Sequence, residues 1–423
     1  MKFGLHTLKN GLRVILVPIK DTETATVMIM TGTGSRYESK EENGMAHFLE
    51  HMFFKGTKKR KKPKVILEEL DAIGSSHNAF TAKNRTAYYA KVPSKYIDAA
   101  VDVISDIFLN STFPKKEIEK ERGTIIQEIN MYEDMPARSI HDIFEALIFG
   151  EEHSLGRTIL GPKKNILSFT REQFIAYQKK AYTAENSVVC VAGKFPEKKI
   201  LSRIRKDFIE MPIGKMPVFE PKIITQKKPQ IKVKYKETDQ THLILGMPAY
   251  PLNHESEYAL AVLTNILGGM MSSRLFTEIR EKRGLAYSVY AWSDAYVDVG
   301  YFGIQAGVEH RNLEETVRVI TRELRKIKKQ GVSAEELRKA KGNVRGKIAF
   351  SAETSSSIAG ITATSLLLKG EISTPQYELK KLDAVKTSDI KRVANEIFKT
   401  PGLNLAVIGP RRNKKKLDTL LRI

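Results

Sequence analysis

Cysteine is almost absent from this chain of 423 residues, since Cys190 is the only one. A single cysteine excludes an intrachain disulfide, and such sparse use is typical of proteins that fold in a reducing compartment. The sequence also has no apolar run long enough to span a membrane, and its first residues have neither the apolar core nor the cleavage site of a targeting signal. We therefore expect a cytoplasmic protein with no membrane partner.

Low-complexity tracts and long runs of glycine, serine or proline are also missing. The composition, with 41% hydrophobic and 28% charged residues, is that of a globular protein. The length favours two domains. Because no glycine-rich loop follows an apolar strand pattern, a dinucleotide-binding domain has no support. The chain is expected to fold throughout, without a bound dinucleotide.

Acidic residues are fewer than basic ones, 49 against 70, and the formal net charge is +21. Such an excess attracts acidic partners such as nucleic acids, and the densest basic run is KKRKKPK at residues 58–64. The lysines are nevertheless spread along the chain, and the run contains Pro63 and no aromatic side chain that could stack on a base. We interpret the run as a solvated loop and expect no nucleic-acid partner. The alternative, a nucleic-acid-binding protein, predicts an affinity that falls with salt.

The two halves of the chain follow one plan. Residues 101–108 (VDVISDIF) and 317–324 (VRVITREL) share one helical spacing of apolar residues, and each segment follows a strand and turn pattern and precedes a long charged helix pattern. A repeat of about 200 residues indicates a duplicated domain, because solenoids repeat at much shorter periods. We predict a first domain over residues 1–214, a linker rich in proline and lysine over 215–229, and a second domain over 230–423.

The order of the strand and helix patterns also predicts the fold class. In each half, strand patterns lie close together in the sequence and long helix patterns follow them. This arrangement favours an α+β fold, in which each of two homologous domains has a mostly antiparallel or mixed sheet with helices packed on one face.

Two histidines occur at helical spacing in the first half. His47 and His51 lie in the apolar, proline-free stretch AHFLEHMFFKGT, and residues four apart lie on the same face of a helix. Both imidazoles could therefore bind one metal ion, with Glu50 on the same side. A catalytic zinc site needs three protein ligands, an open position, and a base beside the water. The pattern is short, so a chance meeting of two helix histidines and a surface glutamate is the alternative.

A second helix pattern offers the third ligand. Glu121 and Glu128 lie seven residues apart, hence on one helix face, and either could complete the site. Glu128 is flanked by isoleucines, where an unpaired carboxylate would be costly. In the second half, Ala340 and Lys347 take the positions of Glu121 and Glu128, and residues 260–269 replace the histidine segment. The fold is therefore expected to be repeated, but the metal site is not.

The segments AHFLEHMFFKGT and ERGTIIQEINMYEDMP resemble those of the inverzincin peptidases. This is the insulinase and pitrilysin family, which includes the mitochondrial processing peptidase and its two-domain bacterial relatives, and the likeness covers nearly the whole chain. The resemblance implies that His47, His51 and Glu128 bind Zn²⁺. It also implies that Glu50 is the general base and that Glu121 supports the site without touching the metal.

The resemblance further implies substrate contacts. The segment SSHNAFTAKNRTAYYA is similar to an edge strand on which the family adds its peptide substrate, which implies contacts from Asn78, Ala79 and Phe80. The segment EIREKRGLAYSVYA of the second half is similar to the one that supplies an arginine and a tyrosine to the substrate carbonyl. It implies these roles for Arg280 and Tyr287.

The function implied by this resemblance is that of a zinc-dependent endopeptidase or oligopeptidase, which hydrolyses extended peptides with a zinc-bound water activated by Glu50. The longer relatives link four such domains, with the zinc domain first and the Arg/Tyr domain fourth. A two-domain chain is therefore expected to form a homodimer in which the second domain of one protomer faces the zinc of the other. The alternative is a catalytically silent structural or peptide-binding subunit of the same fold. Manganese or cobalt could replace zinc in such a ligand set.

Overall fold

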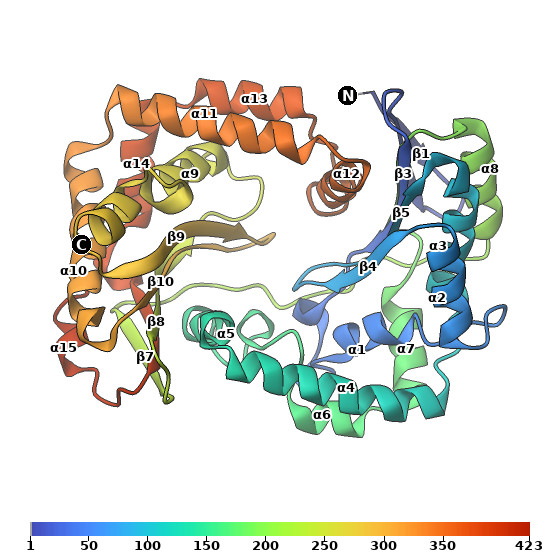
Figure 1. The fold of residues 1–423 in the computed structure, drawn as a ribbon, viewed down its shortest axis with the longest axis horizontal. Helices are drawn as coiled ribbons and strands as arrows, with labels where there is room; N and C mark the ends of the chain where they lie inside the picture. Colours follow the sequence, from blue (N-terminus) through green and yellow to red (C-terminus); the bar gives the residue numbers. More distant parts are fainter. Residues whose placement is uncertain (1) are drawn as a thin grey trace. The chain divides into compact units, whose positions relative to one another are not determined.

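The computed structural model describes residues 2–423, and the chain forms two compact units, each built around one β-sheet (Figure 1). Each unit draws on three stretches of the chain. Unit 1 comprises Met1–Ile129, Arg157–Glu220 and Ala349–Pro375, and unit 2 comprises Asn130–Gly156, Pro221–Ile348 and Gln376–Ile423.

The sheet of unit 1 has six strands in the order β1-β2-β6-β3-β5-β4. Their bounds are β1 Gly4–Thr7, β2 Arg13–Pro18, β3 Thr24–Thr31, β4 Ser76–Thr81, β5 Thr86–Pro93 and β6 Ser187–Gly193. β2 and β6 run parallel, and the other neighbours are antiparallel. β3 and β6 read as continuous apolar runs because they are buried on both faces. β4 lies at the edge of the sheet, next to β5 alone.

One face of this sheet carries the main helical layer. Its helices are α1 Met45–Met52, α2 Pro63–Ala72, α3 Ile97–Asn110, α4 Lys115–Asp134, α6 Lys163–Ser168, α7 Arg171–Ala181 and α8 Glu197–Asp207, with the 3-10 turns η1 Ser35–Tyr37 and η2 Ser94–Tyr96. The core between sheet and helices includes Val27 and Ile29 of β3, Phe48 of α1 and Ile104 of α3. The helix predicted at residues 101–108 therefore lies in α3, with its apolar side in the core.

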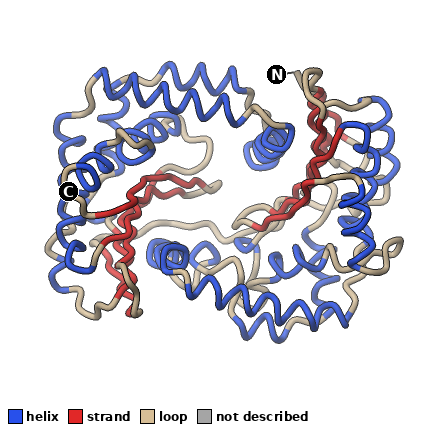
Figure 2. Tube along the Cα trace, in the orientation of Figure 1, coloured by secondary structure: helices blue, strands red, loops and turns tan. Residues whose placement is uncertain are grey.

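Unit 2 repeats this plan. Its strands are β7 Gln230–Tyr235, β8 Thr241–Ala249, β9 Ala286–Ala295, β10 Gly300–Val308 and β11 Asn404–Gly409. Their order, β7-β11-β8-β10-β9 with β7 and β11 parallel, matches β2-β6-β3-β5-β4 of unit 1. The fold class is confirmed, since each sheet is mixed and mostly antiparallel and packs against helices (Figure 2).

The helical elements of unit 2 include the predicted helix at residues 317–324, which lies within α10. They are α5 Pro136–Phe149, α9 Glu257–Thr264, α10 Leu313–Gln330, α11 Ala334–Ser351, α13 Pro375–Ala384, α14 Thr387–Ile397 and α15 Lys415–Asp418. Shorter turns are the π-helices η4 Asn265–Gly269 and η5 Phe276–Glu281, and the 3-10 turns η3 Ser154–Gly156, η6 His310–Asn312 and η7 Thr400–Gly402.

Each half of the sequence contributes one helix to the sheet of the other half. α12 (Ser355–Lys369) covers the second face of the unit 1 sheet, where Ala363 and Leu366 pack with Met28 and Val17. α5 packs in the same way on the unit 2 sheet, where Phe144 joins a cluster with Ile244. The helix on the second face of each sheet was not expected from the sequence.

The predicted linker is irregular, since residues 212–229 form neither helix nor strand. Its first part packs on unit 1, where the Arg36 guanidinium carbon lies 3.9 Å from the centre of the Phe219 ring. The exchange of α5 and α12 means that the compact units do not follow the sequence repeat. The predicted boundaries, 1–214, 215–229 and 230–423, mark the two repeats in the sequence and not the compact units. As domain boundaries they remain a prediction.

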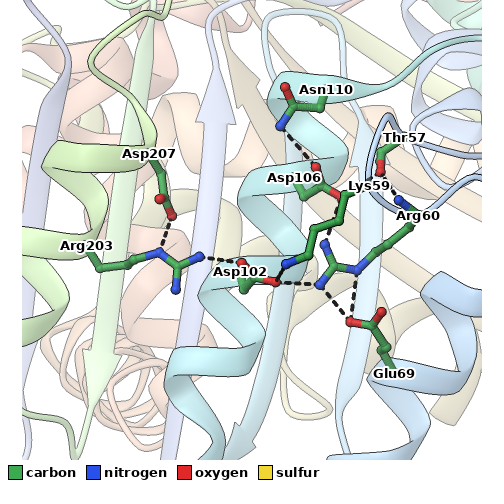
Figure 3. A network of polar contacts seen from close by, with 9 residues as sticks. All are labelled: Thr57, Lys59, Arg60, Glu69, Asp102, Asp106, Asn110, Arg203 and Asp207. Atoms are coloured by element: carbon green, nitrogen blue, oxygen red, sulfur yellow. Dashed lines mark hydrogen bonds and ion pairs between the residues drawn. The ribbon is translucent and has the colours of Figure 1, made fainter.

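The basic run at residues 58–64 is only in part a solvated loop. Figure 3 shows Arg60 within a network of acidic side chains, and Arg60 is only 2% exposed. Its guanidinium pairs with Asp106 at 2.8 Å, Asp102 at 2.5 Å and Glu69 at 2.7 Å. Lys59 also pairs with Asp102. For Arg60 the interpretation as a solvated residue was wrong, because its acidic partners lie outside the basic run, on helices α2 and α3.

Candidate metal centre

His47, His51 and Glu128 come together where α4 passes α1. The Nε2 atoms of His47 and His51 each lie 3.6 Å from Oε2 of Glu128. One ligand atom from each of the three residues lies within 4.8 Å of the others, and the described residues 2–423 contain no other such group of histidine, cysteine or acidic side chains. The predicted metal ligands therefore converge.

The spacing of these atoms fits a metal ion. A tetrahedral zinc ion about 2.0–2.2 Å from nitrogen and oxygen ligands separates those ligands by about 3.3 Å, close to the 3.6 Å seen here. Two neutral imidazoles and one carboxylate are also a set that zinc accepts while keeping a position open. The residues present thus fit the ion that the sequence predicts.

Glu121 lies behind His51. Its Oε1 atom is 2.9 Å from Nδ1 of His51, and its Oε2 atom pairs with Nζ of Lys55 at 2.6 Å. Burial alone would raise the pKa of Glu121, but the contacts with His51 and Lys55 outweigh it and hold this pKa below its usual value. A proton on Nδ1 of His51 that is shared with a carboxylate leaves Nε2 free for a metal.

Glu50 lies on α1 between the two histidines in the sequence and has a different partner. The Thr81 hydroxyl, at the end of β4, donates to Oε2 of Glu50 at 2.6 Å. Glu50 therefore has one carboxylate oxygen engaged by β4, on the helix that carries both histidines. It is not part of the group of three converging side chains, which agrees with a role as base and not as ligand.

The buried face of α1 holds these polar groups in place. Phe48, Leu49 and Met52 are completely buried in the core of unit 1, and the Phe48 ring lies 4.8 Å from that of Phe174 on α7. Apolar residues at these positions occupy one side of the helix, because the α-helical period separates them from the histidines. The polar side of α1 is thereby left for the candidate metal centre.

The predicted substrate residues of the first half lie on an edge strand. Asn78, Ala79 and Phe80 belong to β4, which pairs with β5 on one side. β4 also contacts α1, and Thr81 joins the strand to Glu50. An extended peptide could add to such an edge through main-chain hydrogen bonds.

The predicted residues of the second half lie next to each other. Nη1 of Arg280 donates to the carbonyl oxygen of Tyr287 at 2.7 Å, and its guanidinium lies 4.6 Å from the centre of the Tyr287 ring. The Tyr287 side chain is 77% exposed at the start of β9. Arg283, the other arginine of this segment, is engaged by Glu278. Arg280 and Tyr287 thus form a pair at the surface of unit 2.

Sequence reasoning missed three residues of the centre. Thr81 contacts Glu50, and Lys55 contacts Glu121. Glu38 contacts the backbone at the start of α1. Thr81 directly follows the predicted substrate residues in the same strand pattern, which was the only signal for it. Glu38 lies outside every helix and strand pattern, and only the fold brings it to α1.

Comparisons with known proteins identify the family of the chain. The family model described as insulinase (peptidase family M16) matches residues 13–163, and the peptidase M16 inactive domain matches residues 168–344. The zinc protease YmxG of Bacillus subtilis is 37% identical over 96% of this chain and 98% of its own length.

Solved structures share the fold over almost the whole chain. A protease from Helicobacter pylori has a TM-score of 0.89 and 25% identity, over 97% of this chain and 99% of that one. A chain of Complex III2 from Candida albicans has a TM-score of 0.86 and 18% identity, over 99% of this chain and 100% of that one.

Within residues 2–423, no helix combines the length and apolar character needed to cross a membrane. From the match to the zinc protease over nearly its full length and from both family models, the chain belongs to the insulinase family of peptidases, M16.

Proposed function

We propose that this protein is a zinc-dependent endopeptidase or oligopeptidase that hydrolyses extended peptides in the cytoplasm. The observation that carries the proposal is the convergence of His47, His51 and Glu128, with Glu50 on the same helix as the histidines and held by Thr81. Relatives named as zinc proteases support the peptidase class and the metal.

In this proposal His47, His51 and Glu128 hold the metal. Zinc, when bound, supplies Lewis acidity toward a peptide carbonyl and toward water. Glu121 fixes the ring of His51 and its tautomer through the 2.9 Å contact at Nδ1. Lys55 in turn holds Glu121 at 2.6 Å, so that the carboxylate stays ionised.

Glu50 takes the proton from the attacking water and passes it to the leaving amine. A positioned carboxylate in this role contributes about a hundredfold to ten-thousandfold in rate. The Thr81 hydroxyl occupies Oε2 of Glu50, so Oε1 is the atom free to act as base. Because Thr81 belongs to β4, the same strand that receives the substrate also orients the base.

The peptide is proposed to lie along β4 as an added strand. Main-chain hydrogen bonds from Asn78, Ala79 and Phe80 would give affinity without demanding a particular sequence. Arg280 and Tyr287 are proposed to contact the substrate carbonyl, where the Tyr287 hydroxyl donates to the developing oxyanion. In the proposed homodimer these two residues come from the partner protomer.

The second candidate function is a catalytically silent structural or peptide-binding subunit. The likeness of the fold to a chain of Complex III2 favours it, as does the match of residues 168–344 to an inactive domain. A silent subunit has no need of a base beside three converging ligands. The arrangement of Glu50 and Thr81 therefore favours the peptidase.

The test is digestion of a peptide mixture by the purified protein, with and without a chelator, combined with analysis of bound metal. We expect cleavage that chelator abolishes and Zn²⁺ restores. Glu50→Gln is expected to keep the metal and to lose about a hundredfold or more in turnover, because it removes only the base. Cleavage by Glu50→Gln at the wild-type rate would show that Glu50 is not the base. Metal binding without any cleavage would favour the silent subunit.

A further inference from the structure

The helix that carries both candidate histidines begins without a cap of its own. The residue before α1 is Gly44, which has a φ of 102° and no side chain to accept a hydrogen bond. The first backbone N–H groups of a helix have no partner within the helix, and a buried helix start therefore needs an acceptor from elsewhere. The start of α1 is buried, as Met45, Ala46 and His47 show.

Glu38 supplies this acceptor from outside the helix. Its Oε1 atom accepts from the N–H of Ala46 at 2.7 Å, and its Oε2 atom accepts from the N–H of Gly44 at 2.9 Å. The Asn43 side chain donates to the same Oε2 atom at 3.1 Å. Ala46 directly precedes His47, so the carboxylate fixes the backbone next to the first candidate ligand. A negative charge at the start of a helix also interacts favourably with the helix dipole.

The position of Glu38 is costly in itself. The residue is only 3% exposed, and a carboxylate in such surroundings is unfavourable unless donors compensate for the lost water. Burial raises the pKa of Glu38 to about 7, although the hydrogen bonds from Ala46, Gly44 and Asn43 lower it. A residue placed at this cost for capping alone would be unusual, since serine, threonine, aspartate or asparagine at the N-cap does the same work.

Neighbouring segments hold this cap from further sides. The Asn43 side chain donates to the carbonyl oxygen of Thr158 at 2.9 Å, and Asn165 donates to the carbonyl oxygen of Asn43 at 3.0 Å. The Arg157 guanidinium donates to the backbone oxygen of Glu38 at 2.6 Å. At Gly161 the chain comes so close that a Cβ atom would lie 2.3 Å from the oxygen of Asn43. These contacts hold Glu38 and Asn43 in place relative to residues 157–165.

We propose that Glu38, together with Asn43, is a positioning residue of the candidate metal centre: it sets the start of α1 so that His47 and His51 meet Glu128. The inference rests on the ligands assigned in the proposed function. The contacts that need this placement are the two 3.6 Å distances to Oε2 of Glu128. A metal site tolerates displacements of only about 0.5 Å, so a small shift of α1 would separate its two histidines from the carboxylate on α4.

The test compares Glu38→Gln with the wild type in metal binding. The side-chain amide keeps the size of Glu38 but turns an N–H₂ group toward backbone N–H donors. We expect the dissociation constants for Zn²⁺ and Co²⁺, measured by competition with a chelator, to rise about 10- to 100-fold, as for other residues that orient ligands from behind. The visible absorption of bound Co²⁺ should also change, because it reports the geometry of the ligands and does not require activity.

Thr170→Ala is the matched control. Thr170 caps α7 by accepting from the N–H of Gln173, and α7 carries no candidate ligand. Losing that cap should lower the urea midpoint of unfolding slightly and leave metal affinity and the Co²⁺ spectrum unchanged. If Glu38→Gln fails to fold, Asn43→Ala decides. It removes one donor to Glu38 and should weaken metal binding several-fold.

The inference would be overturned if folded Glu38→Gln had the metal affinity and the Co²⁺ spectrum of the wild type. If Glu38→Gln does not fold, the same result in Asn43→Ala would overturn it. An equal loss of affinity in Thr170→Ala would also overturn it, because stability alone would then explain the effect. Failure of the proposed function would give other results than failure of this inference. A wild-type protein that binds the metal but cleaves no peptide leaves this test intact, and a wild type that binds no metal removes the ligands themselves.

Discussion

Four glutamates surround α1, and their neighbours separate their roles. Glu128 faces two imidazoles, Glu121 lies between His51 and a lysine, and Glu50 is held by a threonine hydroxyl. Glu38 faces backbone N–H groups at the helix start. Of the four, only Glu128 offers a ligand atom to an ion that both histidines could also bind. Residue type alone therefore does not assign the chemistry, but the partners of each carboxylate do.

The two glutamates of α4 should respond differently to the same substitution. Glu128→Gln is expected to lose most of its bound metal, and His51→Ala likewise, because each removes a ligand. Glu121→Gln should retain more metal, with an affinity reduced about 10- to 100-fold. Metal content after dialysis, measured by atomic absorption, separates the two classes. Stoichiometric zinc and full activity in Glu128→Gln would remove Glu128 from the ligand set.

Thr81 offers a test of how the base is oriented. Thr81→Val removes the hydroxyl that binds Glu50 and keeps the shape of the side chain. A hydrogen bond to a charged group contributes about 1.5–3 kcal/mol, and about 1.4 kcal/mol corresponds to tenfold in rate. We therefore expect kcat to fall about tenfold or more, with KM and metal content nearly unchanged. Thr81→Ser, which keeps the hydroxyl, should be close to the wild type. A rise in KM alone would instead place Thr81 in substrate binding.

The sequence predicted the residues of this site that share one helix or one strand. His47, Glu50 and His51 follow from the helical period, and their meeting with Glu128 followed from the family resemblance. Thr81 and Glu38 escaped because their contacts join segments that are distant in the sequence. Such contacts leave no periodic signal, since periodicity reports only which face of an element is buried.

At the scale of elements, the same limit applies to the packing of helices. The apolar pattern of α5 and of α12 indicates a buried helix in each case, and both helices exist. The pattern does not say which sheet buries them. The long helices α4 and α11 each begin in one unit and end in the other. α5 follows α4 and α12 follows α11, so each of them packs on the sheet of the other half of the sequence. The repeat, by contrast, predicted that the two sheets would be alike, and their strand orders match.

The network around Arg60 shows why the net charge is a poor guide to single residues. Asp102 accepts from Lys59, Arg60 and Arg203 (Figure 3). Burial alone would raise the pKa of Asp102, but these three cations outweigh it and hold the pKa well below its usual value. Asp102 should therefore stabilise the packing of α3 against α8 and the segment before α2.

Asp102→Asn is expected to lower the free energy of unfolding by about 1.5–3 kcal/mol at neutral pH, because the buried Arg60 loses one of its three carboxylate partners. The folded-state pKa lies below the unfolded value of about 3.9, so the stabilisation is complete above that value and is lost as pH falls toward the folded pKa. The difference between wild type and variant should therefore shrink below about pH 4, measured by urea unfolding across pH. Glu68→Gln, in the exposed pair with Lys64, should change stability by less than about 1 kcal/mol. A difference for Asp102→Asn that does not depend on pH would contradict this account.

At the scale of the whole molecule, the two units have similar sheets, but within residues 2–423 only unit 1 contains a candidate metal centre. In unit 2, the position that corresponds to Glu128 is taken by Lys347, whose ammonium donates to Oδ1 of Asn265 at 3.0 Å and to the oxygen of Gly269 at 2.9 Å. A fixed positive charge there repels a cation. The surface of unit 2 instead presents the pair of Arg280 and the exposed Tyr287. We therefore expect the two units to have different chemical tasks.

This division of tasks leads to the last prediction, which concerns the proposed homodimer. If Tyr287 of one protomer completes the site of the other, a lesion in each chain can be compensated in a mixed dimer. Tyr287→Phe should cost about a hundredfold to a thousandfold in turnover, as for other oxyanion donors. Glu50→Gln should be inactive for a different reason, the loss of the base. Each variant alone places one lesion in both sites of its symmetric dimer.

Mixing the two variants under conditions of subunit exchange should restore activity. In a mixed dimer one site carries both lesions and the other carries neither, so each mixed dimer should recover up to about half of the wild-type activity, as the two-fold symmetry of a closed dimer requires. Exchange is verified with differently labelled chains, and activity is followed on one peptide. A mixture of Glu50→Gln with Glu128→Gln is the matched control, because both lesions lie in the same unit and no arrangement of the two chains yields an intact site. Exchange without recovery would mean that each chain completes its own site, and full activity of a monomer at high dilution would remove the need for a dimer.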